Sequence, residues 1–131
     1  MVHLKDAADY PLAQAVKGLI LVTGRNTNYQ GMIDECLVAA RAGQDAIPAA
    51  QRRYVDALDA LARGELTEAV TVYEALLADH RTDLFAPRLV QQELFWMGEA
   101  RWMADVCEAS APAWSETDPG YSMFLSVQAF A

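Results

Sequence analysis

The sequence predicts an all-α fold built from antiparallel pairs of amphipathic helices. In the segment from Leu66 to Leu77 the apolar residues recur at intervals of three and four, as on one face of a helix. Alanine and leucine, which favour helices over strands, are prominent in the composition. Glycine and proline stand mainly between the apolar segments. Together these patterns indicate amphipathic helices joined by short turns.

A repeated turn specifies the type of helix pair. Gly64 and Gly98 each separate two apolar stripes and lie 34 residues apart, which is the period of tetratricopeptide repeats. Ala69 and Tyr73 follow Gly64 with the small-x3-aromatic spacing of that repeat, although Arg81 stands where its consensus has proline. We therefore expect antiparallel helix–turn–helix repeats of tetratricopeptide type, about three pairs plus a final helix, stacked as a short right-handed solenoid.

The first predicted repeat spans residues 9–43. Pro11 suits a first helical turn, and the apolar stripe that follows it stops near Gly24. The polar run 26–28 offers a turn and a side-chain cap to the second helix of the pair. Residues 1–8 are expected to be a tail or the end of a preceding helix.

The second and third predicted repeats span residues 47–80 and 82–114. Each is divided near its middle by the glycine of the repeated turn. The polar connection 79–83 can cap the helix that follows it. A final helix is expected within residues 119–131.

Composition excludes several classes of partner. The formal charge of −8 disfavours nucleic acid, which needs a basic face. No segment approaches the roughly 20 apolar residues that cross a bilayer, and the first residues lack the apolar core of a signal peptide. Cys36 and Cys107 both fall on apolar stripes and are expected to be buried free thiols in a reducing compartment. We expect a cytoplasmic protein that binds neither nucleic acid nor membrane.

The sequence offers little chemistry. His3 and His80 are too far apart in sequence to suggest a metal site, and no glycine-rich phosphate loop or Gly-x-Ser-x-Gly motif is present. Cys107 has no histidine near it in sequence to act as a base. Four carboxylates around the central turn are expected to form a solvated rim, with an acid–base pair as the alternative: Asp56, Asp59, Glu65 and Glu68. We expect no catalytic residue, metal or cofactor.

A binding surface is the remaining expectation. In tetratricopeptide arrays the first helix of each pair lines a concave groove that holds a peptide or a partner helix. Arg88, Gln92 and Trp96 follow at intervals of four residues and so share one helical face. The residues predicted to face the groove are Gln51, Tyr54, Arg88, Gln92 and Trp96. The alternative is that Trp96 and Phe95 fill the core and Arg88 is simply solvated.

The final helix is unusually apolar for the end of a repeat array, which normally has a polar outer face. Phe124, Leu125 and Phe130 therefore predict an interface. It would be covered by another chain, by the rest of a longer chain, or by a second copy in a homo-oligomer.

An ordered set of short motifs supports this interpretation. It consists of Ala60–Leu66, Leu76–Asp83, Phe95–Gly98, Pro112–Trp114, Pro119–Tyr121 and Ala129–Phe130. The set covers about residues 9–130 and resembles the tetratricopeptide repeat protein 38 family. The resemblance implies a helical repeat fold, a soluble intracellular protein and no catalytic residue to carry over. The sequence departs from the family by having Ala131 where glycine is expected and by ending there, which implies the amino-terminal part of a longer member or a short form completed by a partner.

We expect a protein–protein interaction module that binds a peptide, a partner protein or the rest of its own chain. An alternative is a non-catalytic wall or subunit of an enzyme. In that case four aromatic residues would gather and enclose a small apolar ligand: Trp96, Trp102, Trp114 and Tyr121. A self-assembling structural homo-oligomer is the third possibility.

Overall fold

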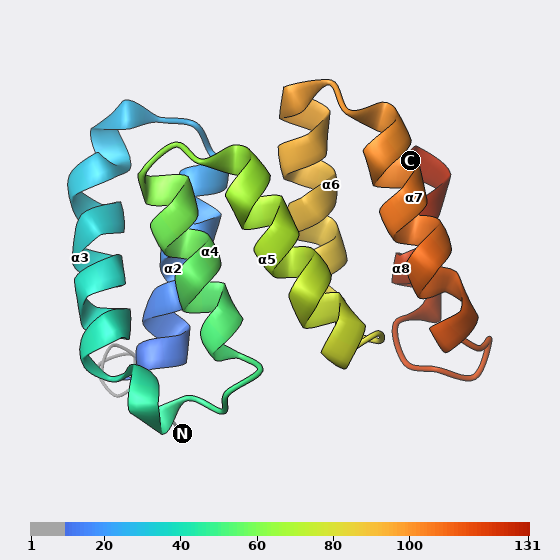
Figure 1. The fold of residues 1–131 in the computed structure, drawn as a ribbon, viewed down its shortest axis with the longest axis horizontal. Coiled ribbons are helices and arrows are strands. Elements are labelled where there is room, and N and C mark those ends of the chain that lie inside the picture. The colour runs from blue at the N-terminus through green and yellow to red at the C-terminus, as the bar shows by residue number, and fades with distance from the viewer. Residues whose placement is uncertain (1–9) are drawn as a thin grey trace. The chain divides into compact units, whose positions relative to one another are not determined.

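The computed structural model of the protein describes residues 10–131 (Figure 1). The predicted tail, residues 1–8, and His3 lie outside the described residues. In the described part the chain forms seven α-helices and three short 3-10 helices, and no strand. The α-helices are α2 (Pro11–Thr23), α3 (Gln30–Ala42), α4 (Arg52–Ala62), α5 (Leu66–Asp79), α6 (Phe85–Met97), α7 (Ala100–Ser110) and α8 (Tyr121–Phe130). The all-α fold is confirmed.

The 3-10 helices are η1 (Thr27–Tyr29), η2 (Gln44–Ala46) and η3 (Ala111–Ala113). Within residues 10–131, no helix has both the length and the apolar character needed to cross a membrane. The chain divides into two compact units at Val72–Tyr73, a boundary that lies inside α5. We call residues 10–72 the first unit and residues 73–131 the second unit.

The first unit is a packed set of three helices, in which α2, α3 and α4 all contact one another. Gly18 permits the close approach of α2. A Cβ atom built at Gly18 would lie 2.6 Å from Leu58 of α4 and 3.2 Å from the Cβ atom of Cys36 of α3. Leu19 and Leu58 are completely buried in this core.

The second unit packs α6 against α7 and places α8 against both. Leu94 of α6 is completely buried, and Phe124 of α8 stacks on Trp114 with ring centroids 5.2 Å apart. Gly120 immediately precedes α8 with a φ of +88°, and a Cβ atom there would overlap the side chain of Leu84. A side chain at position 120 would therefore be excluded both by backbone conformation and by space.

The predicted glycine turn has the same geometry at both of its positions. Gly64 and Gly98 take φ values of +80° and +74°, the left-handed region that glycine adopts without steric penalty. The amide after each glycine donates to a carbonyl five residues earlier, from Glu65 to Ala60 and from Glu99 to Leu94, both at 2.9 Å. This is the Schellman arrangement that satisfies the last carbonyls of a helix. The 34-residue sequence period thus has a counterpart in the backbone.

The turn after α2 differs from these two. Gly24 has a φ of −70°, and the next residue, Arg25, takes the positive φ of 52°. The Asn26 side chain then accepts a hydrogen bond from the Asn28 amide at 3.0 Å. Asn26 therefore caps the 3-10 helix η1, whereas α3 begins after Tyr29 without a side-chain cap, so the predicted cap of that helix is wrong. The left-handed glycine of the other two turns is also absent here.

The start of α6 agrees with the sequence prediction. Asp83 Oδ1 accepts hydrogen bonds from the amides of Phe85 (2.8 Å) and Ala86 (2.9 Å). These bonds satisfy two of the amides that have no partner within the first turn of a helix. The polar connection before α6 therefore does cap it.

Candidate partner-binding surface

The end of α6 exposes two large aromatic side chains. The inward arc of this helix is occupied by residues such as Leu89, Val90 and Leu94, all of them buried. Phe95 and Trp96 lie outside that arc in the last turn and are 56% and 55% exposed. The alternative in which these two rings fill the core is therefore wrong.

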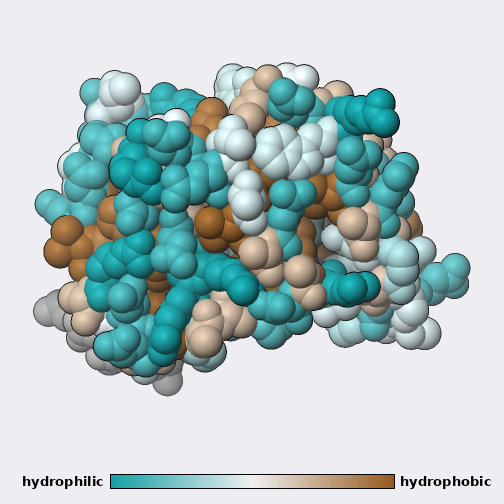
Figure 2. All heavy atoms as spheres, in the orientation of Figure 1, coloured by the Kyte–Doolittle hydropathy of each residue, from teal (hydrophilic) through white to brown (hydrophobic). Residues whose placement is uncertain are grey.

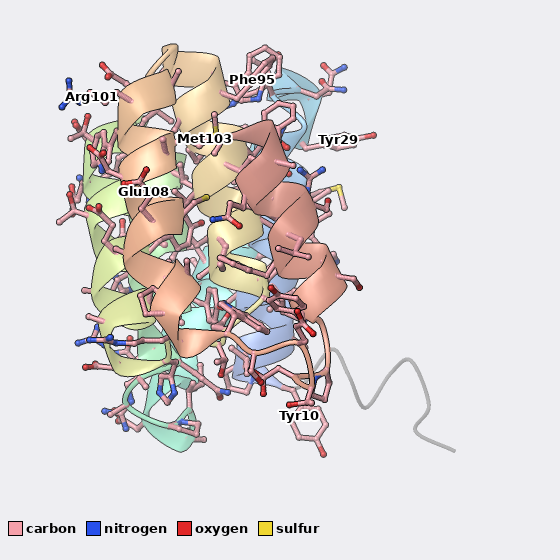
Figure 3. All side chains as sticks on the ribbon, turned by 90° about the vertical axis from the view of Figure 1, so that its right-hand side faces the viewer. Tyr10, Tyr29, Phe95, Arg101, Met103 and Glu108 are labelled. Atoms are coloured by element: carbon pink, nitrogen blue, oxygen red, sulfur yellow. The ribbon has the colours of Figure 1, made fainter. Side chains whose placement is uncertain are left out.

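A third ring from α8 completes the group. Phe130 is 55% exposed, and its ring centroid lies 5.9 Å from that of Phe95. Phe95 in turn meets Trp96 edge to face, with centroids 5.7 Å apart and planes at 71°. Figure 3 labels Phe95 at the end of α6, beside the end of α8. We call Phe95, Trp96 and Phe130 the aromatic cluster.

The aromatic cluster is large enough to matter energetically. Aromatic side chains can each bury about 150–250 Å², so three rings that are a little over half exposed leave on the order of 300 Å² of apolar surface in water. This equals the largest apolar patch on many monomeric proteins, and such patches often mark interaction sites. On the face drawn in Figure 2 most of the surface is hydrophilic, with hydrophobic side chains in separate patches. Another apolar surface lies along α2, where Ile20 and Tyr10, the residue just before the helix, are 59% and 61% exposed.

The predicted stripe along α6 reaches the surface only in part. Arg88 and Trp96 are exposed, and Gln92 between them is half-buried. Arg88 Nη1 donates to Oε1 of the buried Gln91 at 2.7 Å. This bond fixes the guanidinium against α6 and uses part of its donor capacity. The stripe therefore presents the guanidinium group of Arg88, held by Gln91, and the exposed ring of Trp96.

The predicted groove residues of the first unit differ in their exposure. Gln51 is exposed just before α4. Tyr54 is only 5% exposed and belongs to the core. Tyr54 therefore offers no contact surface to a partner, because its place on the apolar stripe of α4 turns the ring inward.

The predicted interface on the final helix also needs correction. Leu125 and Phe130 are exposed as expected, at 42% and 55%. Phe124 is 2% exposed, because its ring stacks on Trp114 at an interplanar angle of 12°. Of the three residues, only Leu125 and Phe130 are available to a partner.

The carboxylates around the central turn lie at the surface, in agreement with the predicted solvated rim, and three of the four also form ion pairs. Arg41 binds Asp56 at 2.8 Å and Asp59 at 2.7 Å. Arg63 binds Asp59 at 3.2 Å and Glu68 at 3.0 Å. The hydrogen bond from Arg41, more than the one from Arg63, lowers the pKa of Asp59. A carboxylate held ionised in this way is a poor general acid, so the geometry indicates a structural network.

The aromatic residues of the alternative small-ligand pocket do not share one site. Trp102 Nε1 donates to Glu74 Oε1 at 2.9 Å. Trp114 is stacked on Phe124 in the core, and Trp96 packs on Phe95 at the surface. Tyr121 is half-buried at the start of α8. The three tryptophans therefore lie in three different local environments.

The two cysteines are free and buried. Burial raises the pKa of both thiols, which makes Cys36 and Cys107 weak nucleophiles at neutral pH. Within residues 10–131 no three histidine, cysteine or acidic side chains are grouped so that they could hold a metal ion.

The chain was also compared with known proteins. No known protein family matches the sequence, and no solved structure matches the fold.

Proposed function

We propose that this protein is a protein–protein interaction module built from helical repeats of tetratricopeptide type. In this proposal the aromatic cluster is the main contact for a peptide or a partner protein. The observation that carries the proposal is that Phe95, Trp96 and Phe130 are each more than half exposed, and that the ring of Phe95 contacts both of the others across two helices.

The energetics favour a binding role for such a group. Trp, Tyr and Arg are enriched in hot spots, where truncating one side chain weakens binding by about 2 kcal/mol or more. The cluster contains Trp96, and Arg88 lies on the same helix. Ring contacts within the cluster restrict the side chains before binding, which reduces the entropy lost on association. Arg88 adds a donor whose position is already fixed by Gln91. A partner that presents an apolar side chain beside a carboxylate or carbonyl group would match this surface.

Two observations support the repeat type and the compartment. The Schellman turns at Gly64 and Gly98 repeat at the tetratricopeptide period. The free thiols of Cys36 and Cys107 suit a reducing compartment such as the cytoplasm.

The proposal is tested with a peptide library displayed on phage and selected on the full chain. The selected peptides are expected to bind with micromolar affinity, and the double substitution Phe95→Ala/Trp96→Ala is expected to weaken them by at least about tenfold. Adding Arg88→Glu should weaken them further. Tyr29→Ala is the matched control, because Tyr29 is an exposed ring of the first unit. Equal affinity for the folded double variant and the wild type would refute the proposal.

Self-association is the second candidate, favoured by the exposure of Leu125 and Phe130 on α8. Light scattering after size-exclusion chromatography measures the mass of the particle directly. A dimer that becomes a monomer in Phe130→Ser would support this candidate, and a wild-type monomer at all concentrations tested would remove it.

A further inference from the structure

The second unit contains a hollow that the aromatic cluster does not share. It lies between the end of α5 and α7 and has a volume of about 260 Å³. Leu77 of α5 and Val106 of α7 provide apolar lining. Polar side chains also line it, namely Glu74, Arg81, Asp105 and Ser110. The volume equals that of roughly nine water molecules, which suits a small ligand or one side chain.

Two of the charged side chains that line the hollow have no partner among residues 10–131. These are Arg81 and Asp105, whose side chains make no hydrogen bond or ion pair there. Glu74 uses Oε1 to accept the indole proton of Trp102. Its other oxygen makes no further hydrogen bond within the described residues. Charged groups of both signs are therefore open to a ligand.

Ser110 places a hydroxyl group on the wall of the hollow. The residue is only 6% exposed, and its hydroxyl makes no hydrogen bond to any described residue. The hydroxyl oxygen itself keeps contact with solvent. A ligand atom in the hollow could therefore accept its proton.

The charges are separated along the hollow. The hydrogen bond between Trp102 of α7 and Glu74 of α5 joins the two helices at one end of the hollow. The other lining residues come after Trp102 on one side and after Glu74 on the other. The two helices therefore run in the same direction along the hollow. Asp105 lies towards Glu74, and Ser110 lies towards Arg81, which is in the turn just after the end of α5 at Asp79. From Glu74 to Asp79 the helix rises by about 7.5 Å. One end of the hollow is acidic and the other offers two donors.

We propose that this hollow binds a carboxylate joined by an aliphatic stem to an ammonium or guanidinium group. The cation would bind Glu74 and Asp105, and the stem would cover Leu77 and Val106. The carboxylate would accept hydrogen bonds from Arg81 and from the hydroxyl of Ser110. A basic amino acid has this chemistry, whether it is free or forms the carboxyl terminus of a polypeptide.

The inference goes beyond the proposed function, because it uses different residues and a different ligand. Loss of the aromatic cluster by Phe95→Ala/Trp96→Ala is expected to leave binding in the hollow unchanged. The two proposals can therefore fail separately.

The test titrates the full chain with 6-aminohexanoate and follows the indole N–H of Trp102 by NMR. Because this group bonds to Glu74, its chemical shift is expected to change saturably, with a Kd in the millimolar range or below. Hexanoate, which lacks the cation, and pentylamine, which lacks the carboxylate, are expected to bind at least about tenfold more weakly. An unchanged Trp102 signal, or equal binding of all three probes, would overturn the proposal.

Substitutions test which end of the hollow binds the carboxylate of the ligand and which end binds its cation. Arg81→Gln is expected to weaken 6-aminohexanoate by about tenfold and to leave pentylamine unaffected, and Asp105→Asn should have the opposite selectivity. Glu108→Gln is the matched control, since this exposed carboxylate of α7 points outward and lies outside the hollow (Figure 3). Ser110→Ala is expected to weaken carboxylate probes about threefold. Equal effects of Asp105→Asn and Glu108→Gln would contradict the assignment.

The source of the ligand is then distinguished with lysine derivatives. N-acetyl-lysine mimics a carboxyl-terminal residue, and N-acetyl-lysine amide mimics an internal one. Tighter binding of N-acetyl-lysine than of lysine would indicate a polypeptide terminus, and the reverse order would indicate the free amino acid. Equal binding of N-acetyl-lysine and its amide would refute the role given to the carboxylate.

Discussion

The two units of the chain use their surfaces differently. Residues 10–72 carry seven acidic and six basic side chains, and Arg41 and Arg63 connect three of the carboxylates in one network. Residues 73–131 carry nine acidic and only three basic side chains, and this unit holds the aromatic cluster. In the first unit, charges stabilise contacts between helices. In the second, three exposed rings are grouped on two helices, and the side chains of Arg81 and Asp105 make no bond to any described residue.

The difference is instructive because the backbone turns at Gly64 and Gly98 are alike. Similar turns can therefore carry surfaces with different functions, since turn geometry depends on glycine and on main-chain bonds, whereas the surface depends on outward-facing side chains. A shared repeat pattern therefore predicts the turn geometry and says little about the surface.

The largest expected effects concern the cores. Leu58→Ala in the first unit and Leu94→Ala in the second each remove a completely buried side chain and should reduce the free energy of unfolding by about 2–5 kcal/mol. Urea unfolding followed by circular dichroism measures both. Similar losses would mean that the units differ at the surface alone. A loss below about 1 kcal/mol in one of them would mean that its core is less well packed.

Substitutions of glycine should distinguish the cost of a positive φ angle from the cost of a steric clash. Gly64→Ala introduces a side chain at positive φ with no atom within 4 Å, so a loss of about 1 kcal/mol is expected. Gly120→Ala adds a clash with Leu84 to the same strain and should lose about 2–4 kcal/mol. Thermal unfolding of both variants tests the order. Equal losses would show that Leu84 moves aside without penalty.

The ion-pair network should give the first unit a pH dependence. The folded pKa of Asp59 lies below its ordinary value of 3.8, so the stabilisation is present above that pH and disappears as the pH falls through the folded value. Asp59→Asn should therefore destabilise by about 1 kcal/mol or less at pH 7, because the pair is partly exposed, and by almost nothing near pH 2. Urea midpoints at the two pH values measure this. Glu116→Asn, at an exposed position of the second unit, should show no such dependence.

A smaller effect per residue than in the cores is expected for the aromatic cluster. Phe95→Ala/Trp96→Ala should reduce the free energy of unfolding by about 1–2 kcal/mol for each ring, because more than half of each ring is already in water. Chemical denaturation of the double variant checks this. A loss as large per residue as in the cores would mean that the rings stabilise the second unit, and their exposure would then need a structural explanation.

Much of the fold could be predicted from local patterns. Helical spacing located the seven helices, and Asp83 was recognisable as a cap because its side chain acts on amides two or three residues away. The left-handed Arg25 could not be predicted, since nothing in its neighbourhood demands that conformation of a residue with a side chain.

The surface was less predictable, because exposure depends on contacts between distant segments. Tyr54 and Phe95 both stand on apolar stripes, yet the first is buried and the second is exposed. The Asp59–Arg63 pair was visible as an i, i+4 spacing, whereas Arg41 reaches Asp59 from 18 residues away. The hollow at Ser110 likewise required the alignment of two helices that are separated in sequence.

The placement of the tryptophans has a spectroscopic consequence. All three, Trp96, Trp102 and Trp114, belong to the second unit, where one is exposed, one is hydrogen-bonded to a carboxylate and one is stacked in the core. Intrinsic tryptophan emission of the wild-type protein therefore reports on the second unit alone, with three distinct signals. The first unit emits only through tyrosine, and a single tryptophan introduced in place of the exposed Tyr29 would make its transitions visible separately.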